Sequence, residues 1–181
     1  MVEIKQERVS IFIDGSNLYH SLKALNGIKI DFEKLVKVLS KGKILINAFY
    51  YIAPLDIISD EEKYWKHQKF LAELEKISNF KVVLCTLRKY TKEDGTFGFE
   101  VKGDDVCLAN DMLVGAYEDL YDTAILVSGD EDFIPVINTL KKLNKQTENA
   151  FFMFTSSKKL RKLCDKITNL KVILDKIKLE K

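Results

Sequence analysis

The feature that most constrains this chain is the alternation of short apolar segments with segments of helical spacing along almost its whole length. Strand-like apolar segments occur at 9–13, 44–52, 81–87, 123–127 and 150–154, and 170–174 is a candidate sixth strand. Parallel sheets covered by helices on both faces produce this alternation. The sequence therefore predicts one α/β domain, residues 1–181, with three layers and a mostly parallel central sheet.

The segments between these strands carry apolar residues three and four positions apart, as helices do. Helices are expected through 18–25, after a cap at Asp31, at 59–78, at 104–117, at 133–143, and after a cap at Ser156 or Ser157 that continues to Ile167. One segment differs. Asp94-Gly95 stands between two partly alternating arms, which predicts a hairpin inserted at 88–101.

Composition excludes several classes of protein. Hydrophobic residues make up 46% and charged residues 31%, as in soluble globular domains. The first ten residues are charged, and no window approaches the roughly 18 apolar residues of a membrane span. We therefore expect no membrane association and a cytoplasmic location. Cys85, Cys107 and Cys164 form no C-x-x-C pair, and only two histidines are present, so reduced and mostly buried thiols are expected rather than a zinc site.

The net charge of +2 hides an asymmetry between the two parts of the chain. From residue 141 onward there are 11 Lys, 1 Arg and 4 acidic residues, a balance of +8, which leaves −6 for residues 1–140. The basic part could hold a polyanion beside an acidic site. The alternative is that the lysine-rich helices are only solvated faces.

Aspartates follow two of the expected strands directly. Asp14 comes after the first strand, and Asp130 and Asp132 come after the fourth. Ligands of parallel sheets bind beyond the carboxyl ends of the strands, at a point where the strand order reverses. If the two strands are neighbours, three carboxylates converge there. Gly15 and Gly129 are expected to let the backbone turn sharply beside them.

The helix predicted at 104–117 adds further carboxylates. At 100° per residue, Asp105 falls in line with the apolar Met112 and Ala116, while Asp104 and Asp111 share one flank. A charged group on an inward face is costly unless it is paired or binds a metal ion. Each aspartate also has an ordinary alternative role as a turn residue, a helix cap or a solvated side chain.

Taken together, so many negative charges at one end of a sheet call for a cation. Carboxylate ligands without Cys or His suit Mg²⁺ or Mn²⁺. Two such ions about 4 Å apart can activate water and stabilise the leaving oxygen of a phosphodiester. The same arrangement would serve other phosphate chemistry.

These motifs resemble those of a known family, the NYN domains, which include the LabA-like proteins. Residues 12–18 are similar to the opening F-I-D-x-x-N, 102–112 to K-G-x-D-x-x-L-x-x-D, and 126–133 to S-G-D-x-D-F. Residues 160–165 resemble a weaker L-x-x-x-x-D segment that ends at Asp165. The ordered set spans nearly the whole chain.

The resemblance implies a PIN-like, Rossmann-like fold and ribonuclease activity that depends on Mg²⁺ or Mn²⁺. It makes Asp14, Asp105, Asp130 and Asp132 the catalytic, metal-binding acids. The residues expected to surround and orient them are Asn17, Asp104, Asp111 and Ser128. Asp104 departs from the family pattern, which is usually apolar at that position.

The expected partner is single-stranded RNA, and self-association into a homo-oligomer is left open. Cationic side chains near the motifs would follow the phosphates; they are Arg88, Lys102, Lys158, Lys159 and Arg161. In the hairpin, Tyr90, Phe97 and Phe99 could stack on bases. The alternative for Phe97 and Phe99 is that they anchor the hairpin in the core.

Two other functions compete with a ribonuclease. An RNA-binding or regulatory module of the same fold could keep the acidic pocket and have little activity. A phosphatase is disfavoured, because the D-x-D nucleophile motif of haloacid-dehalogenase phosphatases is not found where Asp14-Gly15-Ser16 follows the first strand.

Overall fold

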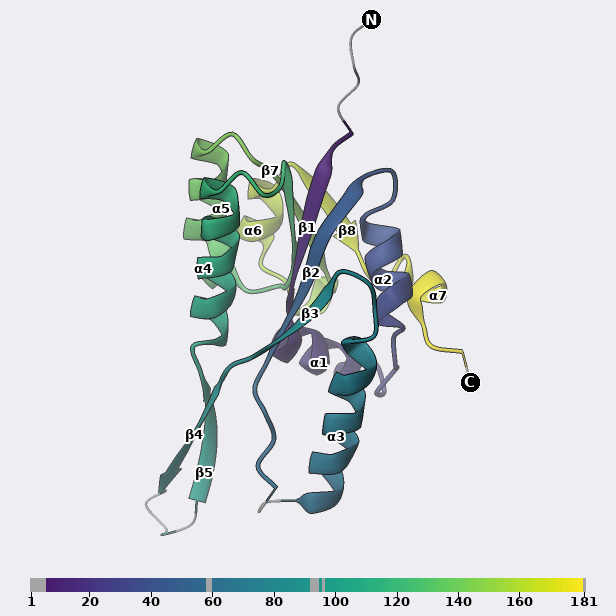
Figure 1. The fold of residues 1–181 in the computed structure, drawn as a ribbon, viewed down its shortest axis with the longest axis vertical. Coiled ribbons are helices and arrows are strands. Elements are labelled where there is room, and N and C mark those ends of the chain that lie inside the picture. The colour runs from purple at the N-terminus through teal and green to yellow at the C-terminus, as the bar shows by residue number, and fades with distance from the viewer. Residues whose placement is uncertain (1–5, 58–59, 92–94, 96, 181) are drawn as a thin grey trace, which may run out of the picture.

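A computed structural model of the chain describes residues 6–57, 60–91, 95 and 97–180, and its centre is a six-stranded sheet (Figure 1). The strands run in the order β3-β2-β1-β6-β7-β8, and every neighbouring pair is parallel. Their bounds are β1 (Arg8–Asp14), β2 (Ile44–Ile52), β3 (Phe80–Leu84), β6 (Thr123–Val127), β7 (Gln146–Phe151) and β8 (Lys166–Asn169). The strand order reverses where β1 meets β6. The predicted three-layer α/β fold with a parallel sheet is confirmed.

Helices cover both faces of the sheet. They are α1 (Gly15–Ala24), α2 (Phe32–Leu39), α3 (Glu61–Leu74), α4 (Asp104–Tyr117), α5 (Ile134–Lys142), α6 (Lys158–Leu163) and α7 (Leu174–Ile177), with short 3-10 turns at Glu131–Phe133 and Met153–Thr155. Within the described ranges, no helix is both long enough and apolar enough to cross a membrane.

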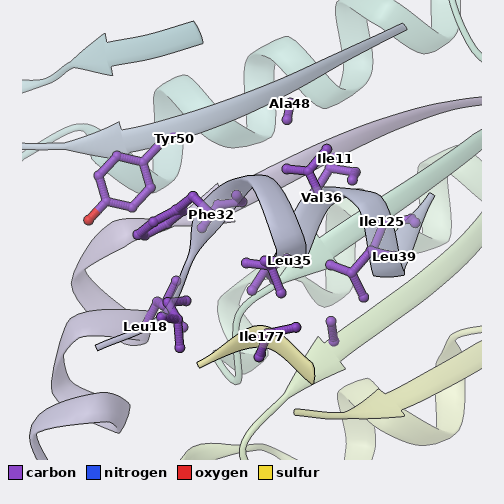
Figure 2. Packing of buried hydrophobic residues seen from close by; sticks show 14 of the residues in the cluster. Ile11, Leu18, Phe32, Leu35, Val36, Leu39, Ala48, Tyr50, Ile125 and Ile177 are labelled. Atoms are coloured by element: carbon purple, nitrogen blue, oxygen red, sulfur yellow. The ribbon is translucent and has the colours of Figure 1, made fainter. Parts of the chain in front are cut away.

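Two apolar cores lie on opposite faces of the sheet. One packs α2, α3 and α7 against the sheet, with Leu35, Ile11 and Ile125 buried at its centre (Figure 2). The other packs α4, α5 and α6 against the opposite face, with Met112 and Leu126 buried. Strand β1 is buried along nearly its whole length, because it lies in the middle of the sheet and feeds side chains into both cores.

The helix ends follow the expected capping chemistry. The Asp31 carboxylate accepts a hydrogen bond from the Lys34 amide at 3.0 Å and starts α2. The Ser157 hydroxyl accepts from the Lys159 amide at 3.2 Å and starts α6, so Ser157 rather than Ser156 is the cap. These bonds satisfy amide donors that the first turn of a helix leaves without partners.

The last part of the sheet differs from the sequence prediction. The fifth strand lies at Gln146–Phe151 rather than 150–154, and the sixth lies at Lys166–Asn169 rather than 170–174. The sequence of β7, QTENAF, begins with polar residues, yet Thr147 and Asn149 are buried and hydrogen-bonded. Helix α6 ends at Leu163, so Ile167 belongs to a strand and not to that helix.

The predicted hairpin is confirmed and extends beyond the sheet. Strands β4 (Thr86–Thr91) and β5 (Phe97–Lys102) pair antiparallel, and they project past the carboxyl edge of the sheet, as does α3 (Figure 1). The Asp94 position of the turn lies outside the described residues. Phe97 is 60% exposed, so the alternative that it anchors a core is wrong.

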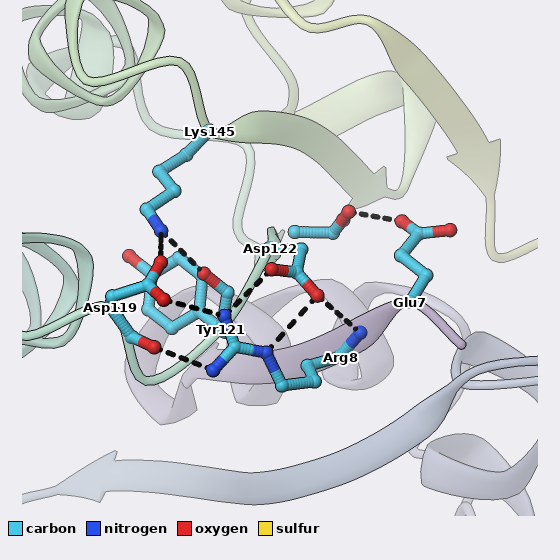
Figure 3. Close-up of polar contacts among 7 residues, drawn as sticks. Glu7, Arg8, Asp119, Tyr121, Asp122 and Lys145 are labelled. Carbon is cyan, nitrogen blue, oxygen red and sulfur yellow. Dashed lines mark hydrogen bonds and ion pairs between the residues drawn. The ribbon is translucent and has the colours of Figure 1, made fainter. Parts of the chain in front are cut away.

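An ionic cluster ties together the amino-terminal edge of the sheet (Figure 3). The Arg8 guanidinium lies 2.7 Å from the Asp122 carboxylate and 3.0 Å from that of Asp119. Lys145 pairs with Asp119 and donates to the Tyr121 carbonyl at 2.9 Å. These contacts join the start of β1 to the loops that enter β6 and β7, and so reinforce the alignment of the central strands.

Removing a central core side chain should measure how much this packing stabilises the fold. Leu35→Ala leaves a cavity between α2 and the sheet and should cost roughly 2–5 kcal/mol of unfolding free energy. Val172→Ala, at a side chain 79% exposed, is the matched control and should cost under about 0.5 kcal/mol. Urea unfolding monitored by circular dichroism measures both. Equal losses in the two variants would contradict the assigned core.

Candidate functional site

Two neighbouring strand ends build the centre of the candidate site. Ile13 of β1 pairs with Val127 of β6, which brings Asp14 next to Ser128. The Asp14 side chain is 6% exposed. One of its oxygens accepts from the Asn17 amide at 2.9 Å, and the other accepts from the Ser128 hydroxyl at 2.8 Å. Asp14 thus caps α1, as a turn residue could, and is also fixed at the reversal of strand order.

The loop after β6 is held by a chain of hydrogen bonds that starts from the same residues. The Gly129 amide donates to the Asn17 side-chain oxygen at 3.0 Å, and the Asp130 amide donates to the Ser128 hydroxyl at 3.1 Å. The Asp132 amide donates to the Asp130 carboxylate at 2.9 Å, so Asp130 rather than Asp132 caps the following turn. Asn17 and Ser128 therefore position the backbone that carries Asp130.

Gly15 and Gly129 are required by space and not by backbone conformation. Both were expected to allow sharp turns; the chain does turn directly from β1 into α1 at Gly15, but neither glycine has a positive φ, so the left-handed conformation is not what requires them. A Cβ at Gly15 would overlap the Tyr51 carbonyl oxygen, and one at Gly129 would overlap the Thr155 carbonyl oxygen. The two glycines let neighbouring backbone segments closely approach the acidic loops, a name used here for the ends of β1 and β6 that carry Asp14, Asp130 and Asp132 together with the first turn of α4.

The first turn of α4 brings two more carboxylates to the site. The residue before it, Gly103, has a φ of 82°, and no side chain caps the helix, so neither Asp104 nor Asp105 serves as its cap. The Ser16 hydroxyl donates to Asp104 at 3.3 Å, which joins α4 to the start of α1. Acidic residues in the first turn interact favourably with the helix dipole.

Asp105 lies within electrostatic reach of the other carboxylates. Its pKa is raised to about 6, first by burial and then by the negative charges of Asp14, Asp104, Asp130 and Asp132. Burial also raises the pKa of Asp14, and Asp104 and Asp130 add to the effect, although two hydrogen bonds oppose it. The site therefore disfavours its own full ionisation and would gain from a nearby cation.

The donor set fits a hard divalent cation in kind. In the parts of the chain that the structure describes, no three His, Cys, Asp or Glu side chains lie close enough together to hold a metal ion by themselves. Mg²⁺ commonly binds through one or two carboxylates and takes water and phosphate oxygens as its other ligands. The buried carboxylate of Asp14 and the destabilised carboxylate of Asp105 meet that smaller requirement.

Two aspartates named by the sequence motifs do not lie at the acidic loops. Asp111 accepts a hydrogen bond from the buried Tyr51 hydroxyl at 2.9 Å and lines a cavity of about 190 Å³ between α4 and the sheet. Asp165 accepts from the Thr147 amide at 2.9 Å and pairs with Lys141 at 2.8 Å, near the amino end of β7. Asp165 therefore secures the sheet at the edge opposite the acidic loops.

Sequence reasoning gave too little weight to residues that support the site. Tyr50 is buried beside Asp14, and its pKa is raised by burial and then by the Asp14 charge. The Asn149 amide group donates to the Ser128 carbonyl at 2.8 Å and to the Leu126 carbonyl at 3.1 Å, so it holds the end of β6. Asn149 lies outside the strand predicted at 150–154, so apolar patterning gave no signal for it.

The predicted cationic residues differ in their exposure to solvent and in the partners that they already contact. Lys158 and Lys159 are exposed at the start of α6, where Lys159 lies 3.8 Å from Glu131. Arg161 donates to the Ser156 carbonyl at 2.6 Å and lies over the Phe151 ring, so its guanidinium already has partners. Arg88 is exposed on β4. The side chains of Lys102 and Phe99 lie outside the described residues.

The acidic loops should cost stability, and Asp105→Asn should reveal that cost. A raised folded pKa means that ionised Asp105 is tolerated less well in the folded chain than in the unfolded chain. Stability is therefore lost as pH rises from about 4 through about 6. At pH 7.5 without metal, the variant should gain about 1 kcal/mol after allowance for solvent screening, a Tm rise of roughly 2–4 °C.

Melting curves in EDTA from pH 4 to pH 8 measure this difference. The gain should disappear near pH 4, where Asp105 is protonated in both states. Asp175→Asn, on α7, is the matched control and should show no such gain. A variant Asp105→Asn that melts below the wild type at pH 7.5 would show that the carboxylate stabilises the fold.

Gly129→Ala should test the close approach between the backbone at Gly129 and the backbone at Thr155. The added methyl group overlaps the Thr155 carbonyl oxygen, and neither backbone segment can move easily. We expect a loss of roughly 1–3 kcal/mol. Gly27→Ala is the control, since its Cβ would meet nothing and only its positive φ of 68° is strained. Chemical denaturation compares the two, and a Gly129→Ala variant as stable as the wild type would remove the steric argument.

Comparison with known proteins places the fold and the family. A crystal structure of a protein of unknown function from Vibrio parahaemolyticus is similar, with a TM-score of 0.73 and 22% identity over 99% of this chain and 100% of that chain. At that identity the likeness concerns the fold alone. No curated protein matches. A model of the NYN domain matches residues 8–171, and the chain therefore belongs to the NYN domain family.

Proposed function

We propose that this protein is a divalent-metal-dependent ribonuclease that hydrolyses phosphodiester bonds at the acidic loops. The observation that carries the proposal is that Asp14 and Asp130 follow the neighbouring strands β1 and β6, where the strand order reverses, and that the charges of both act on Asp105. NYN domains have a PIN-like fold related to nucleases, which supports the same reading.

In this proposal Asp14, Asp105, Asp130 and Asp132 hold Mg²⁺ or Mn²⁺ together with water and phosphate oxygens. The bound ion would supply a lower pKa for a coordinated water and a positive charge beside the scissile phosphate. The chain itself orients the ligands: Ser128 and the Asn17 amide fix both oxygens of Asp14.

Electrostatics explains how the same residues would receive a cation and an anionic substrate. A carboxylate with a pKa near 6 is partly protonated at neutral pH, and it can release that proton when a cation arrives. Without the cation, five neighbouring carboxylates repel phosphate. Substrate binding at the acidic loops should therefore depend on the metal.

The surroundings of the acidic loops suit a single strand of RNA. The β4–β5 hairpin and α3 both extend past the carboxyl edge of the sheet (Figure 1). Exposed Tyr90 and Phe97 on the hairpin offer surfaces for stacking on bases. Lys158 and Lys159 offer charge for the phosphates. The proposed location of this activity is the cytoplasm, as expected from the sequence.

One observation favours a second candidate, an RNA-binding or regulatory module with little turnover. The described carboxylates do not form a ready three-ligand cluster, so metal affinity depends on what water and phosphate add. The two candidates differ in whether RNA that binds is also cut.

A cleavage assay with an Asp14→Asn variant decides between the two candidates. Purified protein with labelled single-stranded RNA and Mg²⁺ or Mn²⁺ should produce fragments, EDTA should stop this, and Asp14→Asn should lower the rate on the order of 100-fold. Asp175→Asn, an exposed aspartate of α7, is the control for charge and should retain the wild-type rate. Metal-dependent binding without fragments would favour the module. Cleavage that persists in EDTA would exclude the metal mechanism.

The exposed lysines of α6 predict an effect on RNA affinity. Replacing Lys158, Lys159 and Lys162 with Ala should raise the Kd for RNA several-fold at low salt and lessen its salt dependence, because fewer counterions are released. The matched control replaces three exposed lysines elsewhere, Lys37, Lys171 and Lys176. Fluorescence anisotropy at several salt concentrations measures both. Equal losses of RNA affinity in the two triple variants would show that the effect depends only on the overall charge of the protein.

A further inference from the structure

The cavity that Asp111 lines has aromatic walls and an open margin. Its volume is about 190 Å³, and it lies between α4 and the sheet. Phe12 of β1 and Phe49 of β2 stand side by side in its lining, with ring centroids 5.4 Å apart and ring planes 12° apart. Val114 and Leu120 also line the cavity and are exposed, so a small molecule can enter from solvent there.

Another wall of the cavity is fixed by Gly115 and Tyr121. A Cβ at Gly115 would lie 2.8 Å from the Tyr121 ring, so only a glycine lets this buried ring pack against α4. The Tyr121 hydroxyl donates to the Met112 carbonyl, and its ring meets the Phe12 ring edge-on, with centroids 5.7 Å apart. The wall is therefore preformed and does not depend on a ligand to order it.

Two polar side chains of the lining lack protein partners. Ser10 of β1 pairs with Asn47 of β2, and both side chains share a face of the sheet with Phe12 and Phe49, because side chains alternate along a strand. Ser10 is 2% exposed, yet among the described residues neither its hydroxyl nor the Asn47 side chain makes a hydrogen bond. A buried hydroxyl is costly without a partner, so a group inside the cavity should complete it.

Asp111 contributes a negative charge to the same lining. One of its oxygens accepts from the Tyr51 hydroxyl at 2.9 Å. The other accepts only from the exposed Asn110 side chain at 3.4 Å, which is long for a hydrogen bond. The second oxygen can therefore take a stronger donor, and a donor on a ligand would meet a charged acceptor.

Nearby lysines do not neutralise this carboxylate. Lys81 is exposed and lies over the Phe49 ring, 5.4 Å from its centroid. Lys145 lies over the Tyr121 ring at 5.9 Å and is held by an ion pair of its own. Neither lysine lines the cavity, and within the described ranges Asp111 has no ion pair. The cavity thus favours a ligand that brings its own donor.

We propose that this cavity binds a small aromatic compound of one or two rings that carries an amino or amidino group. The aromatic walls would take the ring, Asp111 would accept from the amino group, and Ser10 and Asn47 would bond polar atoms of the ligand. An apolar cavity of about 150 Å³ can hold benzene, so the present volume admits a ring with a substituent. Anions are excluded, because Asp111 repels them.

The cavity is separate from the acidic loops. Ser10 stands four residues before Asp14 on β1, roughly 13 Å along the strand. Binding in the cavity is therefore independent of the proposed ribonuclease function, and it can be measured in EDTA without RNA.

Benzamidine and adenine are the two test ligands. Benzamidine carries a cationic amidine, and adenine carries a neutral amino group on a ring with polar atoms. Benzoate is the matched control, because it keeps the ring of benzamidine and reverses the charge. Calorimetric titration of the full chain measures each affinity, and NMR amide chemical shifts locate the bound ligand.

Two pairs of variants test the assigned contacts. Asp111→Asn removes the charge and keeps an acceptor for the Tyr51 hydroxyl, and Asp175→Asn on α7 is its control. Val114→Trp fills the margin of the cavity, and Val172→Trp, at an exposed position outside the lining, is its control. Melting curves establish that each variant is folded. If Asp111→Asn does not fold, Val114→Trp and the shift map decide.

At least one of the two ligands should bind the wild type with a Kd of about 1 mM or tighter. The shifts should centre on Val114, Gly115 and Leu120, and benzoate should bind at least roughly tenfold more weakly. Asp111→Asn should weaken binding roughly tenfold, Val114→Trp should abolish it, and both controls should retain it. Which ligand binds distinguishes cationic amidines from nucleobases.

Four results would each overturn the proposal. They are no binding of either ligand, equal binding of benzoate, an unchanged affinity in folded Asp111→Asn or Val114→Trp, and shifts centred on Asp14 and Asp130. None of them depends on whether the protein cuts RNA.

Discussion

The parallel pairing of β1 with β6 is the constraint on which the rest of this structure depends. It is secured at the amino-terminal edge by Arg8 and Asp122 and at the carboxyl edge by the hydrogen bond from Ser128 to Asp14. Both strands are almost completely buried, so a shift in their register would bury the wrong side chains on both faces. The acidic loops inherit their positions from this register.

The same placement sets stability against the proposed binding of a cation. Asp14 lies where burial penalises its charge, and Asp105 is raised to a pKa of about 6 by burial and by its neighbours. A chain selected for stability alone would gain from amides or apolar residues at these positions. Hydrogen bonds from Ser128, Asn17 and Ser16 keep the carboxylates in place despite their repulsion.

Sequence periodicity was sufficient for the layers and for the strand ends that carry Asp14 and Asp130, because apolar burial governs both. The hairpin was predicted from the Asp94-Gly95 turn signal between two partly alternating arms. It failed at β7, where Thr147 and Asn149 are buried through hydrogen bonds that hydrophobic patterns do not encode. It also gave a wrong reason for Gly129, since close approach to the distant Thr155 backbone depends on tertiary structure. Helical spacing placed Asp105 inward but could not show that Asp111 pairs with Tyr51.

The strand order also determines where the chain can be divided. Asp14, Asp105 and Asp130 come from the first strand, the fourth helix and the loop after the sixth strand, and the sheet inserts β1 between β2 and β6. No contiguous fragment short of most of the domain contains all three. A nascent chain emerging from the ribosome therefore cannot bring the three aspartates together until it has been made as far as residue 130.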